Sequence, residues 1–206
     1  PLIRYVAKKH KPMIISTGVA DLDDIQLALD TCYKEGNYDI SLLKCTSEYP
    51  ATYEQANLLT IPDMIHRFGI PVGVSDHTMG SLVPIVAVSL GATIVEKHFI
   101  LSRTNGGPDS AFSMEPNEFR EMVDSIRNVE RALGNVKYDI TDYQRGKRRS
   151  LYARTDIHCG DVFTDQNVGS YRPGVGLSPQ YWDQIMGKTC KREIVKGDVL
   201  RQEDLK

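Results

Sequence analysis

Two histidines, His77 and His98, are the residues of this sequence whose type and spacing best suit chemistry. Each follows a short β-branched run, Val72 to Val74 in one case and Ala92 to Val95 in the other. The apolar segment between them, Leu82 to Leu90, predicts a buried helix, so the stretch indicates one strand–helix–strand unit. Ligands of parallel α/β folds bind at the carboxyl ends of strands, where two imidazoles can converge on one volume. A divalent metal is the simplest ligand for such a pair.

A structural role is the alternative, because a single histidine at a strand end is often only a hydrogen-bonded part of the fold. The pair is more informative, since a separation of 21 residues fits one short crossover between parallel strands. Polar neighbours flank both histidines, namely Ser75, Asp76, Thr78, Glu96 and Lys97. We therefore predict a metal or anion site at this edge of the sheet.

With 41% hydrophobic and 25% charged side chains, the composition is that of a soluble globular protein. A length of 206 residues is enough for one large or two modest domains. A net charge of −2 predicts no binding to nucleic acid or an anionic membrane, and the Lys147–Arg149 cluster is typical of a solvated linker. The longest apolar run, Leu82 to Leu90, is too short to span a bilayer, and nothing resembles a secretory leader, so we expect a cytoplasmic protein. Four cysteines without Cys-x-x-Cys spacing predict reduced, mostly buried thiols: Cys32, Cys45, Cys159 and Cys190.

Four strands, each followed by a helix, are predicted in the first 134 residues. The strands are expected at Met13 to Ile15, Asp39 to Lys44, Pro71 to Val74 and Thr93 to Val95. The helices are expected at Asp21 to Cys32, Ile61 to Phe68, Leu82 to Leu90 and Glu118 to Leu133. This alternation predicts a parallel sheet with helices outside, and the lack of a dinucleotide-binding glycine fingerprint favours a β/α barrel over a doubly wound sheet. Eight such units need roughly 250 residues, so residues 1–134 are expected to be the C-terminal half of a (β/α)8 TIM barrel.

Small polar residues follow the first two predicted strands as well. Ser16-Thr17-Gly18 forms a turn whose backbone amides suit a phosphate or a carboxylate, and Thr46 to Tyr49 follows the second strand. All four strand ends therefore carry polar side chains on the edge where a barrel binds its ligands.

The character of the sequence changes after Gly134. Residues 135–150 are polar and charged and predict an interdomain linker. In residues 151–206, the run from Ile157 to Val168 matches the run from Ile194 to Leu205 at an offset of 37 residues. Both copies contain Gly-Asp-Val, in which the Gly-Asp pair predicts a tight turn between short strands. A small β-rich domain is therefore expected. Its role could be simply to stabilise the protein or to form oligomers.

One arginine, Arg172, stands in the loop between the two copies. The loop reads Tyr-Arg-Pro-Gly-Val-Gly from Tyr171 to Gly176, and its proline and glycines predict an exposed turn. Such a loop suits recognition of a carboxylate or a polar sugar group.

Several motifs in order resemble the sialic acid synthase family, which includes N-acetylneuraminate, legionaminate and pseudaminate synthases. They are Ile-Ser-Thr-Gly (15–18), Leu-Leu-Lys-Cys-Thr-Ser-Glu-Tyr-Pro-Ala (42–51), Ser-Asp-His-Thr (75–78), Glu-Lys-His-Phe (96–99) and Gly-Pro-Asp-Ser-Ala-Phe-Ser-Met-Glu-Pro (107–116). The repeat and the Arg-Pro-Gly loop resemble the family's C-terminal antifreeze-like (SAF, β-clip) domain. Lys44 and the segment after Asp109 are closer to pseudaminate synthases than to neuraminate synthases.

The resemblance implies a condensation of phosphoenolpyruvate with an N-acetylated hexose, here 2,4-diacetamido-2,4,6-trideoxy-altrose, to give pseudaminic acid and phosphate. It implies that His77 and His98 hold a divalent cation of the Mn²⁺ or Mg²⁺ type, which polarises the sugar aldehyde. The positions that match substrate-binding residues of the family are Ser16, Ser47, Ser75, Tyr49, Asp109 and Arg172. Arg172 matches an arginine that reaches the partner subunit's active site, which implies a domain-swapped homodimer.

Other functions remain open from the sequence. An N-acetylneuraminate or legionaminate synthase would share these motifs, and a metal-dependent aldolase or isomerase on the same barrel would use pyruvate in place of phosphoenolpyruvate. The family's phosphate-neutralising lysines and a catalytic carboxylate stand on the first four strands of the barrel, which this chain lacks. A truncated sugar-binding module without activity is therefore a third hypothesis.

Overall fold

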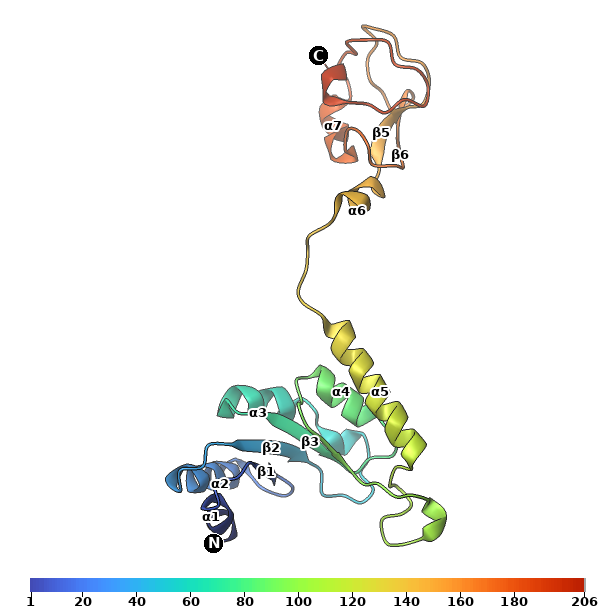
Figure 1. Ribbon diagram of the computed structural model, residues 1–206. Coiled ribbons are helices and arrows are strands. Elements are labelled where there is room, and N and C mark those ends of the chain that lie inside the picture. The colour runs from blue at the N-terminus through green and yellow to red at the C-terminus, as the bar shows by residue number, and fades with distance from the viewer. Residues whose placement is uncertain (206) are drawn as a thin grey trace. The chain divides into compact units, whose positions relative to one another are not determined.

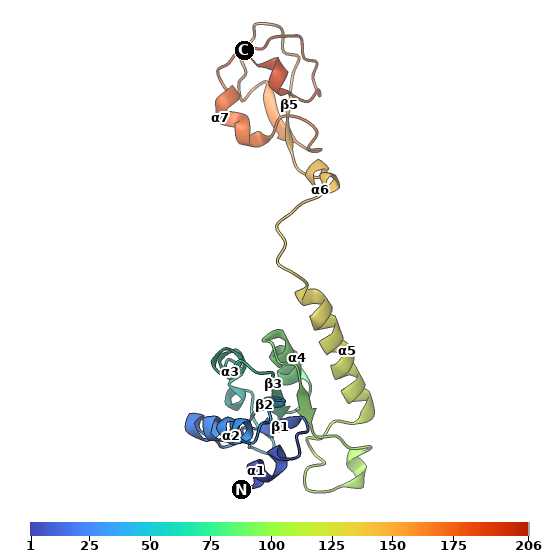
Figure 2. The same ribbon diagram turned by 60° about the vertical axis from the view of Figure 1, so that its left-hand side comes forward.

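The computed structural model describes residues 1–205, and the chain divides into two compact units, Pro1–Asn135 and the residues from Val136 onward (Figures 1 and 2). Each unit has its own hydrophobic core. Within the described part of the chain, no helix is both long enough and apolar enough to cross a membrane.

The first unit is a parallel sheet covered on one face by helices (Figure 1). Its elements are α1 (Leu2–Ala7), β1 (Met13–Ser16), α2 (Leu22–Lys34), β2 (Ile40–Cys45), α3 (Thr60–Phe68), β3 (Val72–Asp76), α4 (Leu82–Ser89), β4 (Val95–Lys97) and α5 (Pro116–Leu133). The strands lie in the order β1-β2-β3-β4 and every neighbouring pair is parallel. This sequential order and the curl of the sheet are those of half a (β/α)8 barrel, so the predicted fold class is confirmed.

Alternation of side chains divides the sheet into two faces. Helix-facing positions such as Leu42, Val72 and Val74 are buried in the main core with residues of the helical layer, including Leu29, Cys32, Ile61, Met64 and Ala87. The opposite face, here called the inner face, carries Ile14, which is 59% exposed, and Gly73. A Cβ atom on Gly73 would lie 2.4 Å from the carbonyl oxygen of Ile94, so only glycine lets β3 and the start of β4 approach this closely.

Polar residues extend the strands beyond the limits that the apolar pattern indicated. The fourth strand was expected at Thr93 to Val95, but β4 covers Val95–Lys97. Its last two residues pair in register with Ser75 and Asp76 of β3. Because Glu96 and Lys97 are polar, their strand conformation left no mark in the hydrophobic pattern.

Acidic side chains cap the starts of two helices of the first unit, α2 and α5. The Asp21 carboxylate accepts a hydrogen bond from the Asp24 backbone N–H at 2.9 Å, and α2 begins at the next residue, Leu22. Glu115 and Glu118 form the equivalent reciprocal cap at α5, with Pro116 in the first turn. Because Glu115 is the N-cap residue, α5 begins at Pro116, two residues before the predicted start at Glu118.

The second unit is a small β-rich fold. Its elements are α6 (Asp142–Gly146), β5 (Ser150–Ala153), β6 (Val168–Tyr171) and α7 (Trp182–Ile185), with short 3-10 turns at Pro179–Tyr181 and Gln202–Asp204. Strands β5 and β6 pair antiparallel. Fully buried side chains of its core include Leu151, Ile157, Phe163, Ile185, Ile194 and Leu200. Helix α6 lies within the segment predicted as a linker, and its start is capped by Thr141.

The repeat in the sequence corresponds to an approximate two-fold symmetry of this unit. Ile157 and Ile194, which are equivalent in the two copies, exchange backbone hydrogen bonds of 2.8 and 2.9 Å. The Phe163 N–H donates to the Lys188 carbonyl at 2.9 Å, and the symmetry-related Leu200 N–H donates to the Leu151 carbonyl at 2.8 Å. The Gly-Asp turns also match, with φ of 95° at Gly160 and 92° at Gly197.

All four cysteines are free thiols. Cys32, Cys45 and Cys190 are buried, whereas Cys159 is exposed in the first Gly-Asp turn of the second unit. Burial raises the pKa of the Cys32 thiol, in line with a packing role.

Candidate active site at the carboxyl ends of the strands

The inner face of the sheet gathers polar side chains at the carboxyl ends of β3 and β4. Ser75 and Glu96 are register partners on these two strands, and the Ser75 hydroxyl donates to Glu96 Oε1 at 2.6 Å. His77 and His98 each stand two residues further along, on the same face by alternation. The structure thus adds Glu96, which the sequence showed only as a polar neighbour of His98, to the inner surface of the site.

The two predicted histidines lie next to each other. Their ring centroids are 5.2 Å apart and the ring planes meet at 74°. His77 is 5% exposed to solvent, whereas 30% of the His98 side chain is exposed. One imidazole is therefore fixed inside the protein, and the other borders open space.

A hydrogen bond decides the tautomer of His77. Its Nδ1 atom lies 2.6 Å from the carbonyl oxygen of Thr46, in the segment that follows β2. A carbonyl oxygen only accepts hydrogen bonds, so Nδ1 must carry the proton. The lone pair of Nε2 is then free to bind a cation or accept a proton, which is the arrangement that metal-binding histidines use.

Aromatic and acidic side chains from two loops surround the histidines. The Tyr49 ring lies 4.2 Å from the His77 ring, and the Phe112 ring lies 4.9 Å from the His98 ring, centroid to centroid. Asp109 brings Oδ2 to 3.7 Å from His98 Nδ1. The structure therefore brings Tyr49 and Asp109 to the histidine pair. It also adds Phe112, which belongs to the 107–116 motif but was given no role from the sequence.

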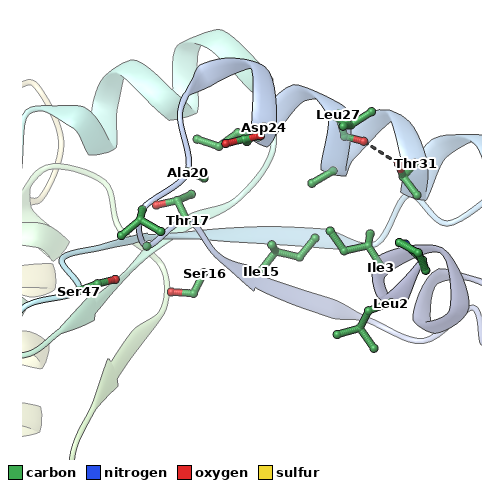
Figure 3. A pocket seen from close by; sticks show the side chains of 15 residues that line it. Leu2, Ile3, Ile15, Ser16, Thr17, Ala20, Asp24, Leu27, Thr31 and Ser47 are labelled. Carbon is green, nitrogen blue, oxygen red and sulfur yellow. Dashed lines mark hydrogen bonds between the residues drawn. The ribbon is translucent and has the colours of Figure 1, made fainter.

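Two further predicted residues, Ser16 and Ser47, lie at the carboxyl end of β1 and just after β2. They line a pocket together with Thr17, Gly18 and apolar residues of α1 and α2, and Figure 3 shows both hydroxyl groups at the same end of this pocket. Gly18 has φ of 44°, and a Cβ atom there would come within 3.1 Å of Ser47 Oγ. The hydroxyl groups and the turn provide the neutral donors expected of an anion site.

The residues present fit a divalent cation held by two nitrogen ligands. Among residues 1–205, no group of three or more His, Cys, Asp or Glu side chains is arranged to hold a metal. His77 and His98 can offer two imidazoles, of which His77 has its tautomer set for binding. The remaining ligands of such an ion would be water and substrate oxygens, which suits a site that must admit a reactant.

Charged residues lie behind the site, on the helix-facing side of the sheet. Lys97 and Asp76 form an ion pair of 2.6 Å, with 1% and 2% of their side chains exposed. Lys44 of β2 is also buried, and this burial lowers the pKa of its ammonium group, an effect opposed by nearby negative charge that includes Asp76. Sequence reasoning placed these residues near the site but gave them no role.

Arg172, the last predicted site residue, belongs to the second unit. It follows β6 and borders a pocket with Tyr152, Arg154, Tyr171 and Lys196. The loop behind it is held by two hydrogen bonds: the Tyr152 hydroxyl donates to the Pro173 carbonyl at 2.8 Å, and the Gly174 N–H donates to the Gly146 carbonyl at 2.9 Å. The arginine therefore stands on a braced, basic surface.

Comparisons with known proteins match both units of the chain to known families. The sequence profile of the NeuB family matches residues 1–138, and that of the SAF domain matches residues 148–206. Pseudaminic acid synthase of Campylobacter jejuni is 41% identical, covering 99% of this chain and 60% of that protein. N,N'-diacetyllegionaminic acid synthase of the same species is 35% identical, covering 98% and 62%. The crystal structure of the spore coat polysaccharide biosynthesis protein SpsE from Bacillus subtilis matches with a TM-score of 0.63 and 32% identity, covering 100% of this chain and 64% of that one. The chain thus spans about 60% of the length of these curated relatives.

Proposed function

Because the chain belongs to the NeuB family and carries a C-terminal SAF domain, we propose that the whole protein is a nonulosonic acid synthase. It condenses phosphoenolpyruvate with the open-chain aldehyde of an N-acetylated hexose, and the products are a nine-carbon 2-keto acid and phosphate. The observation that carries the proposal is the pair of imidazoles at the strand ends, with His77 Nε2 free and the Ser75–Glu96 pair beside it.

The histidines are proposed to hold a divalent cation of the Mn²⁺ or Mg²⁺ type. When bound, such a cation supplies Lewis-acid polarisation of the sugar aldehyde. Thr46 fixes His77 by its hydrogen bond, and Tyr49 and Phe112 pack on the two rings, so the protein holds both ligands in place before substrate binds.

Phosphoenolpyruvate is proposed to bind through Ser16, Ser47 and Ser75. The first two line one pocket beside the Thr17-Gly18 turn, and Ser75 stands on the inner face of the sheet, paired with Glu96. Neutral donors of this kind orient an anion, whereas neutralisation of its charge needs cationic groups in addition.

The chemistry that this arrangement serves has two stages. In the first, C3 of phosphoenolpyruvate forms a bond to the aldehyde carbon, and the aldehyde oxygen takes up the electron pair and then a proton. In the second, water adds to C2, and the tetrahedral adduct loses phosphate by cleavage of its C2–O bond. Asp109 and Tyr49, which border the histidines, are proposed to receive the sugar hydroxyl groups.

The sugar is proposed to be 2,4-diacetamido-2,4,6-trideoxy-altrose, which gives pseudaminic acid. This choice is supported by the higher identity to the relative named pseudaminic acid synthase, 41% against 35% for the legionaminic acid synthase of the same species. Lys44 and the segment after Asp109 support it as well.

A homodimer completes the proposed site. Arg172 of the partner subunit would reach the sugar through an exchange of SAF domains, and its loop is braced for that role by Tyr152 and Gly146. A guanidinium group offers several parallel donors for a carboxylate or an acetamido carbonyl.

Phosphate release by the full-length protein tests the proposal. With Mn²⁺ and phosphoenolpyruvate, we expect release only when an N-acetylated hexose is present, and fastest with the altrose derivative. Pyruvate in place of phosphoenolpyruvate should give no condensation product. Condensation with pyruvate would point to an aldolase instead, and binding of the sugar without any turnover would point to a binding protein.

A further inference from the structure

A buried ion pair links the two residues that immediately precede the histidines. Asp76 precedes His77 and Lys97 precedes His98, and the two are register partners on β3 and β4. Their side chains approach to 2.6 Å and are 2% and 1% exposed, respectively. Because side chains alternate along a strand, this pair lies on the opposite face of the sheet from the histidines. The pair therefore does not contact a cation that the histidines would hold.

The ion pair also holds the chain on the far side of His77. The Asp76 carboxylate accepts hydrogen bonds from the Thr78 backbone N–H at 2.9 Å and from the Thr78 hydroxyl at 3.1 Å. The Lys97 ammonium group donates to the Thr78 carbonyl as well as to Asp76. His77 is thus held between two residues that are both tied to β4, which fixes its backbone relative to that of His98.

Stability alone is a poor explanation for these charges. Their neighbours on the helix-facing side, Val72, Val74 and Val95, are apolar and pack in the core. Replacing a buried ion pair by apolar residues of similar volume is often neutral or stabilising, because the desolvation cost disappears. What the charged pair provides and an apolar pair does not is a directional contact between the ends of two strands.

A second contact of the same kind reaches His77 from β2. The Lys44 ammonium group donates to the Thr46 hydroxyl at 2.6 Å, and the Thr46 carbonyl is the acceptor of the His77 Nδ1 proton. The Thr46 hydroxyl in turn donates to the Gln55 carbonyl at 3.2 Å. Lys44 therefore holds the residue that sets the tautomer and rotation of His77.

We propose that Lys44, Asp76 and Lys97 are positioning residues, which fix the spacing and orientation of the His77 and His98 imidazoles without touching the cation or the substrate. The inference rests on the proposed function insofar as the histidines hold a cation. It adds that the charges on the helix-facing side of the sheet set the affinity of that site. Groups that act through ligands in this way typically change metal affinity by about 10–100-fold.

Mn²⁺ titration of the full-length protein, followed by the electron paramagnetic resonance of free Mn²⁺, tests this in the absence of substrate. We expect the double variant Asp76→Leu/Lys97→Met to keep the wild-type melting temperature within a few degrees but to bind Mn²⁺ about tenfold more weakly. The control is Arg67→Met, which removes an exposed ion pair with Asp63 on α3 and should change neither quantity. Wild-type Mn²⁺ affinity in a folded double variant would show that the pair is structural and overturn the proposal.

Lys44 gives a second test that does not depend on the ion pair. If Lys44 acts through Thr46, then Lys44→Met, Thr46→Val and the combined variant should weaken Mn²⁺ binding by the same factor, since additive effects are expected only of independent sites. Additive losses would mean that Lys44 does not act through Thr46, and no loss would mean that it does not position His77.

Proton NMR of the imidazole N–H groups separates this inference from the proposed function. The His77 Nδ1 proton, identified by its loss in His77→Gln, should be protected in the wild-type protein and exchange faster in Lys44→Met and in the double variant. This exchange measurement needs no metal, so it tests whether Lys44, Asp76 and Lys97 position His77 even if the wild-type protein binds no Mn²⁺. An unchanged Nδ1 proton in both variants would overturn the inference.

Discussion

The Tyr49 ring lies against the His77 ring, with centroids 4.2 Å apart and planes inclined by 35°. Tyr49 is 54% exposed, so its hydroxyl group remains available to a substrate while its ring restrains the imidazole. Removing the ring should therefore damage the site more than removing the hydroxyl group. We expect Tyr49→Ala to lower kcat/KM for the sugar at least about tenfold, equal to ~1.4 kcal/mol. Tyr49→Phe should lose less, mainly as a higher KM, and equal losses in steady-state phosphate release would show that the stacking does not matter.

Asp109 offers a separate test of the sugar side of the site. Its carboxylate lies 3.7 Å from His98 Nδ1 and half of its side chain is exposed. If it receives sugar hydroxyl groups, Asp109→Asn should raise KM for the sugar several-fold and leave KM for phosphoenolpyruvate unchanged. The measurement is a pair of saturation curves, each with the other substrate in excess. Ser110→Ala is the matched control in the same loop, because the Ser110 hydroxyl donates to the Gly107 carbonyl within that loop. A rise in KM for both substrates would mean that Asp109 acts on the whole site.

The order and type of the elements in the first unit followed from the sequence because its strands are short apolar runs that alternate with amphipathic or apolar helices. The ends of β3 and β4 did not, since Asp76, Glu96 and Lys97 are polar and the hydrophobic period carries no information about them. The same polar residues make the contacts that surround the histidines. The sequence-based expectation was therefore weakest where the candidate site is built.

Two features of the structure were not predicted, for different reasons. Phe112 reaches His98 from a loop, and no local pattern reports a contact that only the tertiary fold creates. Helix α6, by contrast, had a local signal that could have been used. Thr141 and Gln144 form a reciprocal cap, and Thr-x-x-Gln is a known start of a helix.

An exposed ion pair in the second unit predicts a pH dependence of its stability. His158 Nδ1 lies 2.7 Å from Glu193 Oε2, and this hydrogen bond raises the pKa of His158. Hydrogen bonds from the Cys159 backbone and then from His158 lower the pKa of Glu193. Because its pKa is raised in the folded protein, His158 contributes to the free energy of unfolding fully below its unfolded-state pKa of about 6.5. This contribution disappears as the pH rises through the pKa of His158 in the folded protein. Glu193, whose pKa is lowered, contributes to the free energy of unfolding above its unfolded-state pKa of about 4.3. This contribution disappears as the pH falls through the pKa of Glu193 in the folded protein.

The difference in melting temperature between the wild-type protein and His158→Gln should therefore be largest between about pH 5 and pH 6 and vanish in alkaline solution. The only tryptophan of the chain, Trp182, packs against the core of the second unit, so its fluorescence follows the unfolding of that unit. In a Glu193→Gln background, the pH-dependent effect of His158→Gln should shrink to a small remainder, because Asp161 and Asp156 also raise the pKa of His158. If the difference in melting temperature between the wild-type protein and His158→Gln does not change with pH, the charged contact between His158 and Glu193 does not contribute to stability.

Gly176, the last residue of the Arg172 loop, tests how tightly the second unit is packed. A Cβ atom there would lie 2.1 Å from Val199 Cγ2 and 2.6 Å from the Leu200 carbonyl oxygen, so the backbone must move to accept any side chain. We expect Gly176→Ala to destabilise the unit by about 1–3 kcal/mol, the usual cost of overpacking. Gly146→Ala is the matched control, because a Cβ atom at the end of α6 meets nothing within 4 Å and should leave stability unchanged or slightly higher. Chemical unfolding followed by Trp182 fluorescence gives both free energies. Equal stabilities of the two variants would mean that the contacts around Gly176 are looser than the structure indicates.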